Sequence, residues 1–130
     1  QKALQWLWDR GHRSAQVLWG NGPGPDHFFG HLHALATAPA GMSVGMLEEE
    51  SRTFRVPKEF SKCYGQGERL SLMPFPTAFS VETENLLFSL KGEDLHAGHR
   101  IGISNQVLQN GRVRISYTDG CLLMTEPLRL

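Results

Sequence analysis

A glycine-rich segment followed by an aspartate and a histidine is the first part of the sequence that could do chemistry. It reads GNGPGP at 20–25 and leads into Asp26 and His27. Glycine-rich turns before a helix can bind anions through their backbone N–H groups. The segment lacks the Gly-Lys-Ser/Thr ending of a phosphate loop and the spacing of a dinucleotide motif. The glycines alone therefore favour a plain connecting loop.

Two histidines follow at a spacing that a metal site could use. His27 and His31 are four residues apart, so on a helix they share one face, whereas His33 points elsewhere. Stable zinc sites need three or four ligands, and no Cys or third His falls in register nearby. We therefore predict no metal site here, with a metal-binding domain built on these two histidines as an alternative.

A polar step, Ser104-Asn105, opens a stretch that otherwise reads as β-sheet. Ser and Asn are common in turns, where their side chains bond to their own backbone. The same two side chains could instead contact a ligand, and the residues alone leave both interpretations open. Sequence spacing assembles no Ser-His-Asp or Cys-His arrangement. The acidic run Glu48–Glu50 is interpreted as a solvated turn.

Composition places the chain among ordinary soluble globular proteins. It has 130 residues, 40% of them hydrophobic and 20% charged, and its formal net charge is zero. The balance of charge predicts neither nucleic acid nor an anionic membrane as a partner. No apolar run approaches the roughly 20 residues that span a bilayer. Cys63 and Cys121 are isolated, which favours reduced thiols and a cytoplasmic location.

The first half of the chain alternates between helix and strand patterns. Leu4, Leu7 and Trp8 recur at helical spacing, and no start signal precedes them, which suggests a piece of a longer protein. A strand is expected at 15–19, a helix capped by Asp26 after it, and a strand at 42–47. This order predicts a crossover between parallel strands.

From about residue 48 the pattern changes to short alternating strands. Three strands, at 105–109, 112–118 and 121–126, are expected to form a meander, because Asn110-Gly111 and Asp119-Gly120 are typical hairpin turns. Pro74 and Pro76 separate two earlier strands. The predicted fold class is α+β: the tail of an α/β domain at 1–50, then an antiparallel β-sandwich at 51–130.

Four segments together resemble the central and C-terminal parts of the thiamine pyrophosphokinase (thiamin diphosphokinase) family. They are LWGNGPGPDHFFGHLHAL, ERLSLMPF, ENLLFSLKGEDL and GISNQV with GRVRISYTDGCLLM. The family typically has Gly-Gly-Arg-x-Asp-His before a helix, a SLIPL-like strand, GLKYPL or GLKWNL, and GISNE. Each motif alone is weak, but their shared order along nearly the whole chain makes the resemblance specific.

The resemblance implies a pyrophosphoryl transfer from ATP to thiamine, which gives thiamine diphosphate and AMP. It implies an N-terminal α/β nucleotide-binding domain, a C-terminal β-sandwich, and a homodimer with thiamine near the interface. Mg²⁺ and ATP are the expected cofactor and co-substrate, and the aspartates that hold Mg²⁺ would precede Gln1. By this reading the 130-residue chain alone transfers no pyrophosphate.

The resemblance also assigns residues. Asp26 is the expected catalytic residue, and His27, Phe88, Ser104 and Asn105 are the expected substrate-binding residues. An aromatic face at Phe88 could stack on the pyrimidine or meet the thiazolium cation, unless it is a plain core residue.

Three positions depart from the family pattern: Pro25 replaces an arginine, His31 an asparagine and Gln106 a glutamate. Arginine is the natural partner of a transferring phosphate. The departures at Pro25 and His31 therefore favour an alternative function, a non-catalytic ligand-binding or dimerisation module of the same fold. The retained Asp26, Ser104 and Asn105 favour the leading hypothesis, a C-terminal fragment of a thiamine pyrophosphokinase-like protein.

Overall fold

The computed structural model describes residues 1–18 and 23–129. Contacts divide the chain into two compact units: unit 1 is Gln1–Arg55 with Leu128–Leu130, and unit 2 is Val56–Pro127. Among the described residues, no helix is both long and apolar enough to cross a membrane. Cys63 is exposed and Cys121 is half-buried, and no disulfide joins them.

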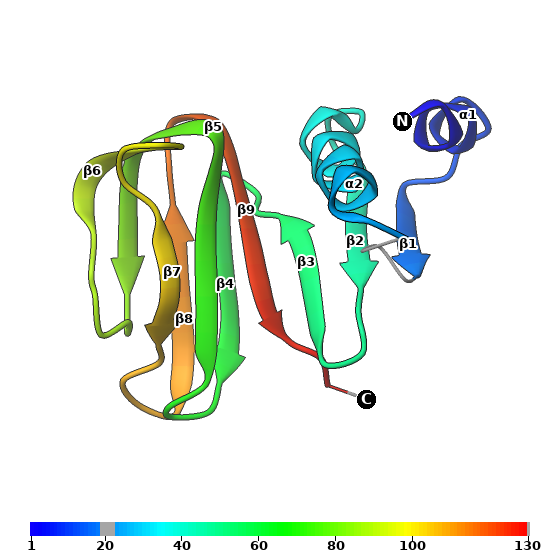
Figure 1. The fold of residues 1–130 in the computed structure, drawn as a ribbon. Coiled ribbons are helices and arrows are strands. Elements are labelled where there is room, and N and C mark those ends of the chain that lie inside the picture. The colour runs from blue at the N-terminus through cyan, green and yellow to red at the C-terminus, as the bar shows by residue number, and fades with distance from the viewer. Residues whose placement is uncertain (19–22, 130) are drawn as a thin grey trace. The chain divides into compact units, whose positions relative to one another are not determined.

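Unit 1 contains a parallel pair of strands joined by a helix (Figure 1). Its elements are α1 (Lys2–Asp9), β1 (Ser14–Leu18), α2 (Pro25–Thr37), β2 (Ser43–Leu47) and β3 (Ser51–Arg55). β1 pairs with β2 in parallel, so α2 is the crossover and the predicted arrangement is confirmed. β3 pairs with β2 in antiparallel orientation and belongs to unit 1, although we expected the second domain to begin at residue 51.

The start of α2 differs from the prediction. We expected Asp26 to cap the helix, but Gly24 occupies the N-cap, no side chain bonds there, and Pro25 begins the helix. A proline fits that place because its φ is already helical and the first turn does not need its N–H. Asp26 lies in the first turn, where the helix dipole favours a negative charge. Trp19 and residues 20–22 of the expected strand and loop lie outside the described residues.

The end of α2 is held by one cation. The guanidinium of Arg55 donates to the carbonyl oxygens of Ala36, Ala38, Pro39 and Met42 at 3.4, 2.7, 3.0 and 3.3 Å. Carbonyl groups at a helix C-terminus have no partner within the helix, and a positive charge there also suits the dipole. Arg55 therefore fixes α2 to the end of β3.

Unit 2 is built around one long strand (Figure 1). Its strands are β4 (Glu59–Tyr64), β5 (Arg69–Glu84), β6 (Lys91–His96), β7 (Gly102–Gln106), β8 (Gly111–Ser116) and β9 (Asp119–Pro127). β5 pairs antiparallel with β6, β7, β8 and β9, and β4 pairs antiparallel with β8. Unit 2 is thus dominated by antiparallel sheet, as the sequence predicted.

Both edges of β5 are occupied by two strands each. Leu72 pairs with β7 and with β9, Ala78 with β6 and with β9, and Glu82 with β6 and with β8. Since a residue in a sheet has one partner on each side, β6 and β7 share one edge and β8 and β9 share the other. β7 and β6 thus follow one another along one edge of β5, and β9 and β8 follow one another along the other edge.

The predicted meander is wrong. The three strands form near the expected ranges, but β7, β8 and β9 each pair with β5 rather than with the next strand. Asp119 and Gly120 form no turn: they are the first two residues of β9 and pair with Phe79 and Ala78 of β5. Just before them, the N–H of Thr118 donates to the Phe79 carbonyl at 2.9 Å. A Cβ on Gly120, whose φ is +88°, would collide with the Thr77 carbonyl oxygen. After β8 the chain therefore continues along β5 as β9 instead of folding back against β8.

The two strands expected on either side of Pro74 and Pro76 are a single strand, β5, of 16 residues. Proline fits an extended backbone but donates no hydrogen bond, so it interrupts a ladder without ending the strand. The pairing with β9 accordingly shifts register between Pro74 and Ala78.

Alternation of side chains predicts most of the core of unit 2. Leu70 and Leu72 are fully buried, as are Val113 and Ile115. Phe79 and Val81 were expected on one face, but Phe79 is 36% exposed and Val81 is fully buried. Ser80 between them has a φ of +53°, and the register with β6 shifts there, so the alternation breaks.

One carboxylate is buried inside unit 2. Glu126 on β9 is 2% exposed, and the ammonium of Lys62 donates to its two carboxylate oxygens at 2.9 and 3.0 Å. The Tyr64 hydroxyl donates to the same group. A buried carboxylate is tolerated only when it is paired and hydrogen-bonded, so these contacts link β4 to the last strand of the unit.

Replacing Lys62 by Met should lower the free energy of unfolding by about 2–3 kcal/mol, because Glu126 loses its opposite charge while the aliphatic chain is kept. Urea denaturation followed by circular dichroism measures the change. The control is Lys58→Met, since Lys58 faces the exposed Asp119 at 4.0 Å. We expect less than about 1 kcal/mol there, and equal losses in both variants would contradict the role of the buried pair.

Candidate functional site

The buried amide of Asn105 holds the backbone of Phe88. Asn105 is on β7 and is 3% exposed. Its Oδ1 accepts the N–H groups of Phe88 and Gln106, and its Nδ2 donates to the Phe88 carbonyl, each at 2.9 Å. Both backbone polar groups of Phe88 are therefore bonded to one side chain. The Phe88 ring is 65% exposed, so it is not a core phenylalanine.

Ser104 has an unusual backbone conformation. Its φ is +59°, its side chain is exposed, and its N–H donates to the Oγ of Ser71 at 2.9 Å. The pairing of β5 with β7 shifts register between Leu70 and Leu72, next to this bond. Residues other than glycine adopt such a φ only when their surroundings impose it.

The loop at 85–90 runs beside β7. The N–H of Leu87 donates to the Gln106 carbonyl at 2.8 Å, and the N–H of Leu108 donates to the Asn85 carbonyl at 3.1 Å. The structure thus brings Phe88 to Asn105, the residue after Ser104, across 17 positions of sequence.

Large apolar side chains are exposed around these residues. We call the following set the β7 surface: Leu87, Phe88, Ile101, Ile103 and Leu108, which are 50%, 65%, 43%, 51% and 45% exposed. Ile103 is on β7, Ile101 and Leu108 are in the segments that flank it, and Leu87 and Phe88 are in the loop at 85–90. Single exposed apolar residues are common, but a group around one strand and its neighbouring loop is typical of a binding or association surface.

The other two predicted site residues are in unit 1. Asp26 and His27 are adjacent in the first turn of α2, with Asp26 Oδ2 and His27 Nε2 4.0 Å apart. Their side chains are 83% and 55% exposed. Both are accessible to a ligand, and they belong to a different unit from Phe88, Ser104 and Asn105.

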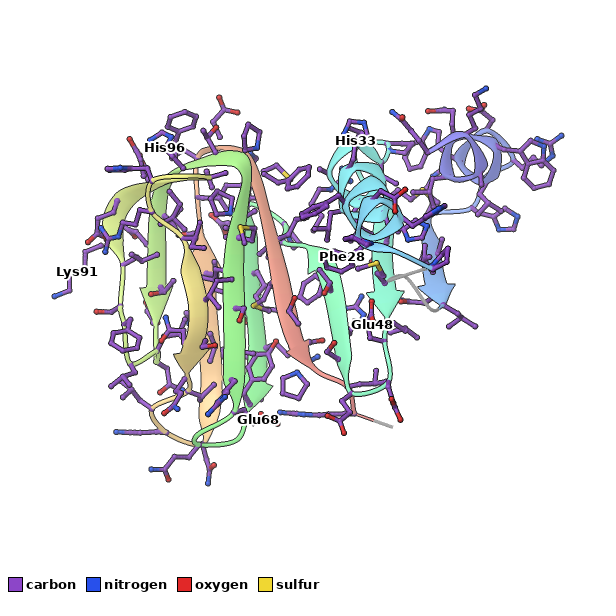
Figure 2. All side chains as sticks on the ribbon, in the orientation of Figure 1. Phe28, His33, Glu48, Glu68, Lys91 and His96 are labelled. Carbon is purple, nitrogen blue, oxygen red and sulfur yellow. The ribbon has the colours of Figure 1, made fainter. Side chains whose placement is uncertain are left out.

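The ligands of the expected Mg²⁺ are predicted to precede Gln1 and so to lie mostly outside this chain. Within residues 1–18 and 23–129, no group of three or more His, Cys, Asp or Glu side chains could hold a metal ion. His31 is half-buried, whereas His33 is exposed and is labelled on α2 in Figure 2.

Glu48 is a candidate that the sequence reasoning missed. Glu49 and Glu50 are exposed as expected, but Glu48 is half-buried, and its Oε1 is a buried atom with no hydrogen-bond partner among residues 1–18 and 23–129. It follows the carboxyl end of β2, which pairs in parallel with β1. Ligands of α/β sheets bind at such ends, and this position was the signal that could have found it.

A hollow of about 690 Å³ lies elsewhere in unit 2, over β4, β8, β6 and the end of β5. Its charged residues are of both signs: Glu59, Glu82, Glu84, Lys91 and Arg114. Figure 2 shows Lys91 extending outward from β6. None of the predicted site residues lines this hollow.

Comparison with protein families decides the relationship. Residues 52–122, more than half of the chain, match the model described as thiamin pyrophosphokinase, vitamin B1 binding domain. The chain belongs to this family. The resemblance inferred from the four sequence segments is therefore confirmed, and the matched range includes Phe88, Ser104 and Asn105. No curated protein matches the chain in sequence.

Solved structures with low sequence identity to this chain share its fold. The chain is similar to thiamine pyrophosphokinase from Bacillus subtilis, with a TM-score of 0.82, 19% identity, and coverage of 99% of this chain and 62% of that one. It is also similar to thiamin pyrophosphokinase from Geobacillus thermodenitrificans, with a TM-score of 0.78, 20% identity, and coverage of 98% and 60%. It is similar as well to thiamin pyrophosphokinase from Candida albicans, with a TM-score of 0.77, 12% identity, and coverage of 97% of this chain and 51% of that one. The chain thus spans between half and two thirds of their lengths.

The backbone at Ser104 gives a test of local strain. Ser104→Gly should unfold with a free energy about 0.5–1 kcal/mol higher than Ser104→Ala, because glycine alone adopts a positive φ without a steric penalty. Both variants lack the hydroxyl, so their comparison isolates the backbone term. Urea titration measures the difference, and an alanine variant as stable as the glycine variant would show that position 104 is not strained.

Proposed function

We propose that this chain supplies the thiamine-binding part of a thiamine pyrophosphokinase. The observation that carries the proposal is an exposed aromatic residue, Phe88, whose backbone is held by the buried Asn105 within the range that matches the vitamin B1 binding domain. Phe88, Ser104 and Asn105 are the substrate-binding residues of unit 2 in this proposal.

The chemistry of these residues suits a flat, partly cationic heterocycle. The Phe88 ring offers a face for stacking on the pyrimidine or for a cation–π contact with the thiazolium. The exposed Ser104 hydroxyl can both donate and accept a hydrogen bond, as a ring with an exocyclic amine requires. Exposed aliphatic side chains of the β7 surface would exclude water around the ring.

Transfer of pyrophosphate from ATP is the reaction we propose for the whole protein. Asp26 as catalytic residue and His27 as a substrate contact would act from the first turn of α2, where the helix dipole favours anionic groups. The aspartates that would hold Mg²⁺ are expected in the part of the protein before Gln1. The two-domain organisation with a β-sandwich and a cytoplasmic location remain predictions.

One observation favours the alternative, a non-catalytic binding module. Pro25, which stands where the family pattern has an arginine, is the first residue of α2 and offers no charge to a phosphate. Thiamine binding without AMP release, measured with ATP and Mg²⁺ in the longest available form of the protein, would support this alternative.

We further propose a homodimer that forms through the β7 surface. Its support is the exposure of five large apolar residues on β7, in its flanking segments and in the adjacent loop, together with the dimer that the family resemblance implies. Symmetric dimers are the commonest soluble assemblies and use the same patch on both subunits.

Phe88→Ala should weaken thiamine binding by about 1–3 kcal/mol, the range for stacking a base on an aromatic ring. Isothermal titration of thiamine into the chain and its variants measures the loss. The matched control is Phe79→Ala, which removes a partly exposed ring that contacts His96 on β6 instead. Wild-type chain that binds no thiamine, or equal losses in both variants, would refute the proposed site.

Ile103→Glu should shift the chain from dimer to monomer, because a buried charge in an apolar interface lacks a partner. Sedimentation velocity at roughly 50 µM, a concentration at which micromolar interfaces persist, measures the distribution. Ser61→Glu is the control, since Ser61 is exposed on β4 and accepts a bond from Arg112. A wild-type chain that sediments only as a monomer would contradict the dimer.

A further inference from the structure

Two side chains that accept backbone N–H groups, those of Asn105 and Ser71, determine how the candidate thiamine surface is presented. The exposed groups of that surface, the Phe88 ring and the Ser104 hydroxyl, are each attached to a backbone segment with few regular ladder bonds. Each segment is instead bonded to one side chain: Phe88 to Asn105, and Ser104 to Ser71. We propose that Asn105 and Ser71 are positioning residues for thiamine, an inference that rests on the proposed function.

Asn105 has almost no hydrogen-bonding capacity left for a ligand. Its Oδ1 accepts two N–H groups and its Nδ2 donates to the Phe88 carbonyl, which leaves a single N–H of the amide. At 3% exposure the side chain is enclosed by protein. Asn105 therefore acts on thiamine through Phe88, by fixing the position from which the ring projects.

Ser71 does the same for Ser104 by a different route. The register of β7 on β5 shifts between Leu70 and Leu72. At this shift the Oγ of Ser71 accepts the N–H of Ser104 at 2.9 Å. The bond holds Ser104, an exposed residue, at a φ of +59°.

The geometry predicts that the four residues affect thiamine binding as two independent pairs, Asn105 with Phe88 and Ser71 with Ser104. A residue that acts only through its partner contributes nothing once the partner's side chain is gone. Removing Ser71 should therefore matter for thiamine only while the Ser104 hydroxyl is present, and removing Asn105 only while the Phe88 ring is present.

The experiment is a pair of double-mutant cycles read by thiamine titration. Ser71→Ala should weaken binding about 2- to 10-fold, as expected for one hydrogen bond, and Ser71→Thr, which keeps the hydroxyl, should stay near wild type. The Ser71→Ala/Ser104→Ala double variant should bind no more weakly than Ser104→Ala. The Asn105→Asp/Phe88→Ala double variant should likewise bind no more weakly than Phe88→Ala. Aspartate is the chosen substitution because it keeps the acceptor but cannot donate to the Phe88 carbonyl. Additive losses would overturn the proposal.

Amide hydrogen exchange in the absence of thiamine separates this inference from the proposed function. Ser71→Ala should speed exchange at the Ser104 amide and not at the Phe88 amide, and Asn105→Asp should loosen the Phe88 segment and not Ser104. If the wild-type chain binds no thiamine, the proposed function fails, while these exchange patterns still decide whether the two side chains position their partners. Unchanged exchange at Ser104 in Ser71→Ala, with Ser71→Thr as its control, would overturn the inference for Ser71.

Discussion

Unit 2 depends on a single constraint, the pairing of one 16-residue strand with four others. β5 carries β6 and β7 on one edge and β8 and β9 on the other, and β4 joins through β8. Every backbone group along β5 must find a partner, although two prolines along the strand donate none. The register between β5 and its neighbours shifts several times. Where regular backbone pairing is interrupted, side chains such as that of Ser71 accept or donate the hydrogen bonds instead.

The candidate site lies at one of these shifts. Where the ladder between β5 and β7 breaks, the Ser71 hydroxyl bonds to Ser104 and the backbone of Ser104 takes a positive φ. The next residue, Asn105, turns its amide inward and bonds to the loop that carries Phe88. A polar residue that would be costly in a regular buried strand is thus stabilised, because each bond it makes satisfies a backbone group that β5 leaves open.

The sequence predicts local structure here better than pairing. Periodicity located the helices and most strands, and the parallel crossover followed from their order, since adjacent parallel strands require a long connection. The meander was wrong because Asp119-Gly120, although typical of a hairpin turn, begins β9 and pairs with β5. A turn signal such as Asn110-Gly111 also does not determine which strand the chain meets next. Asp26 was misplaced because the proline before it competes for the start of α2. At the candidate site, Ser104-Asn105 was recognised by its types and by resemblance, but the sequence holds no sign that Asn105 faces inward or that Ser71 contacts Ser104. These contacts join residues 17 and 33 positions apart through a register shift that no local pattern encodes.

The bonds from Asn105 end on the backbone of Phe88 and make no demand on its side chain. These hydrogen bonds therefore fix the position from which the side chain of residue 88 projects, but they do not restrict which side chain it is. An exchange of one aromatic residue for another at this place would alter the size and polarity of the exposed face while leaving the supporting hydrogen bonds in place. A single substitution at position 88 can accordingly change ligand preference among related proteins, without the compensating substitutions that a change in a packed core would require.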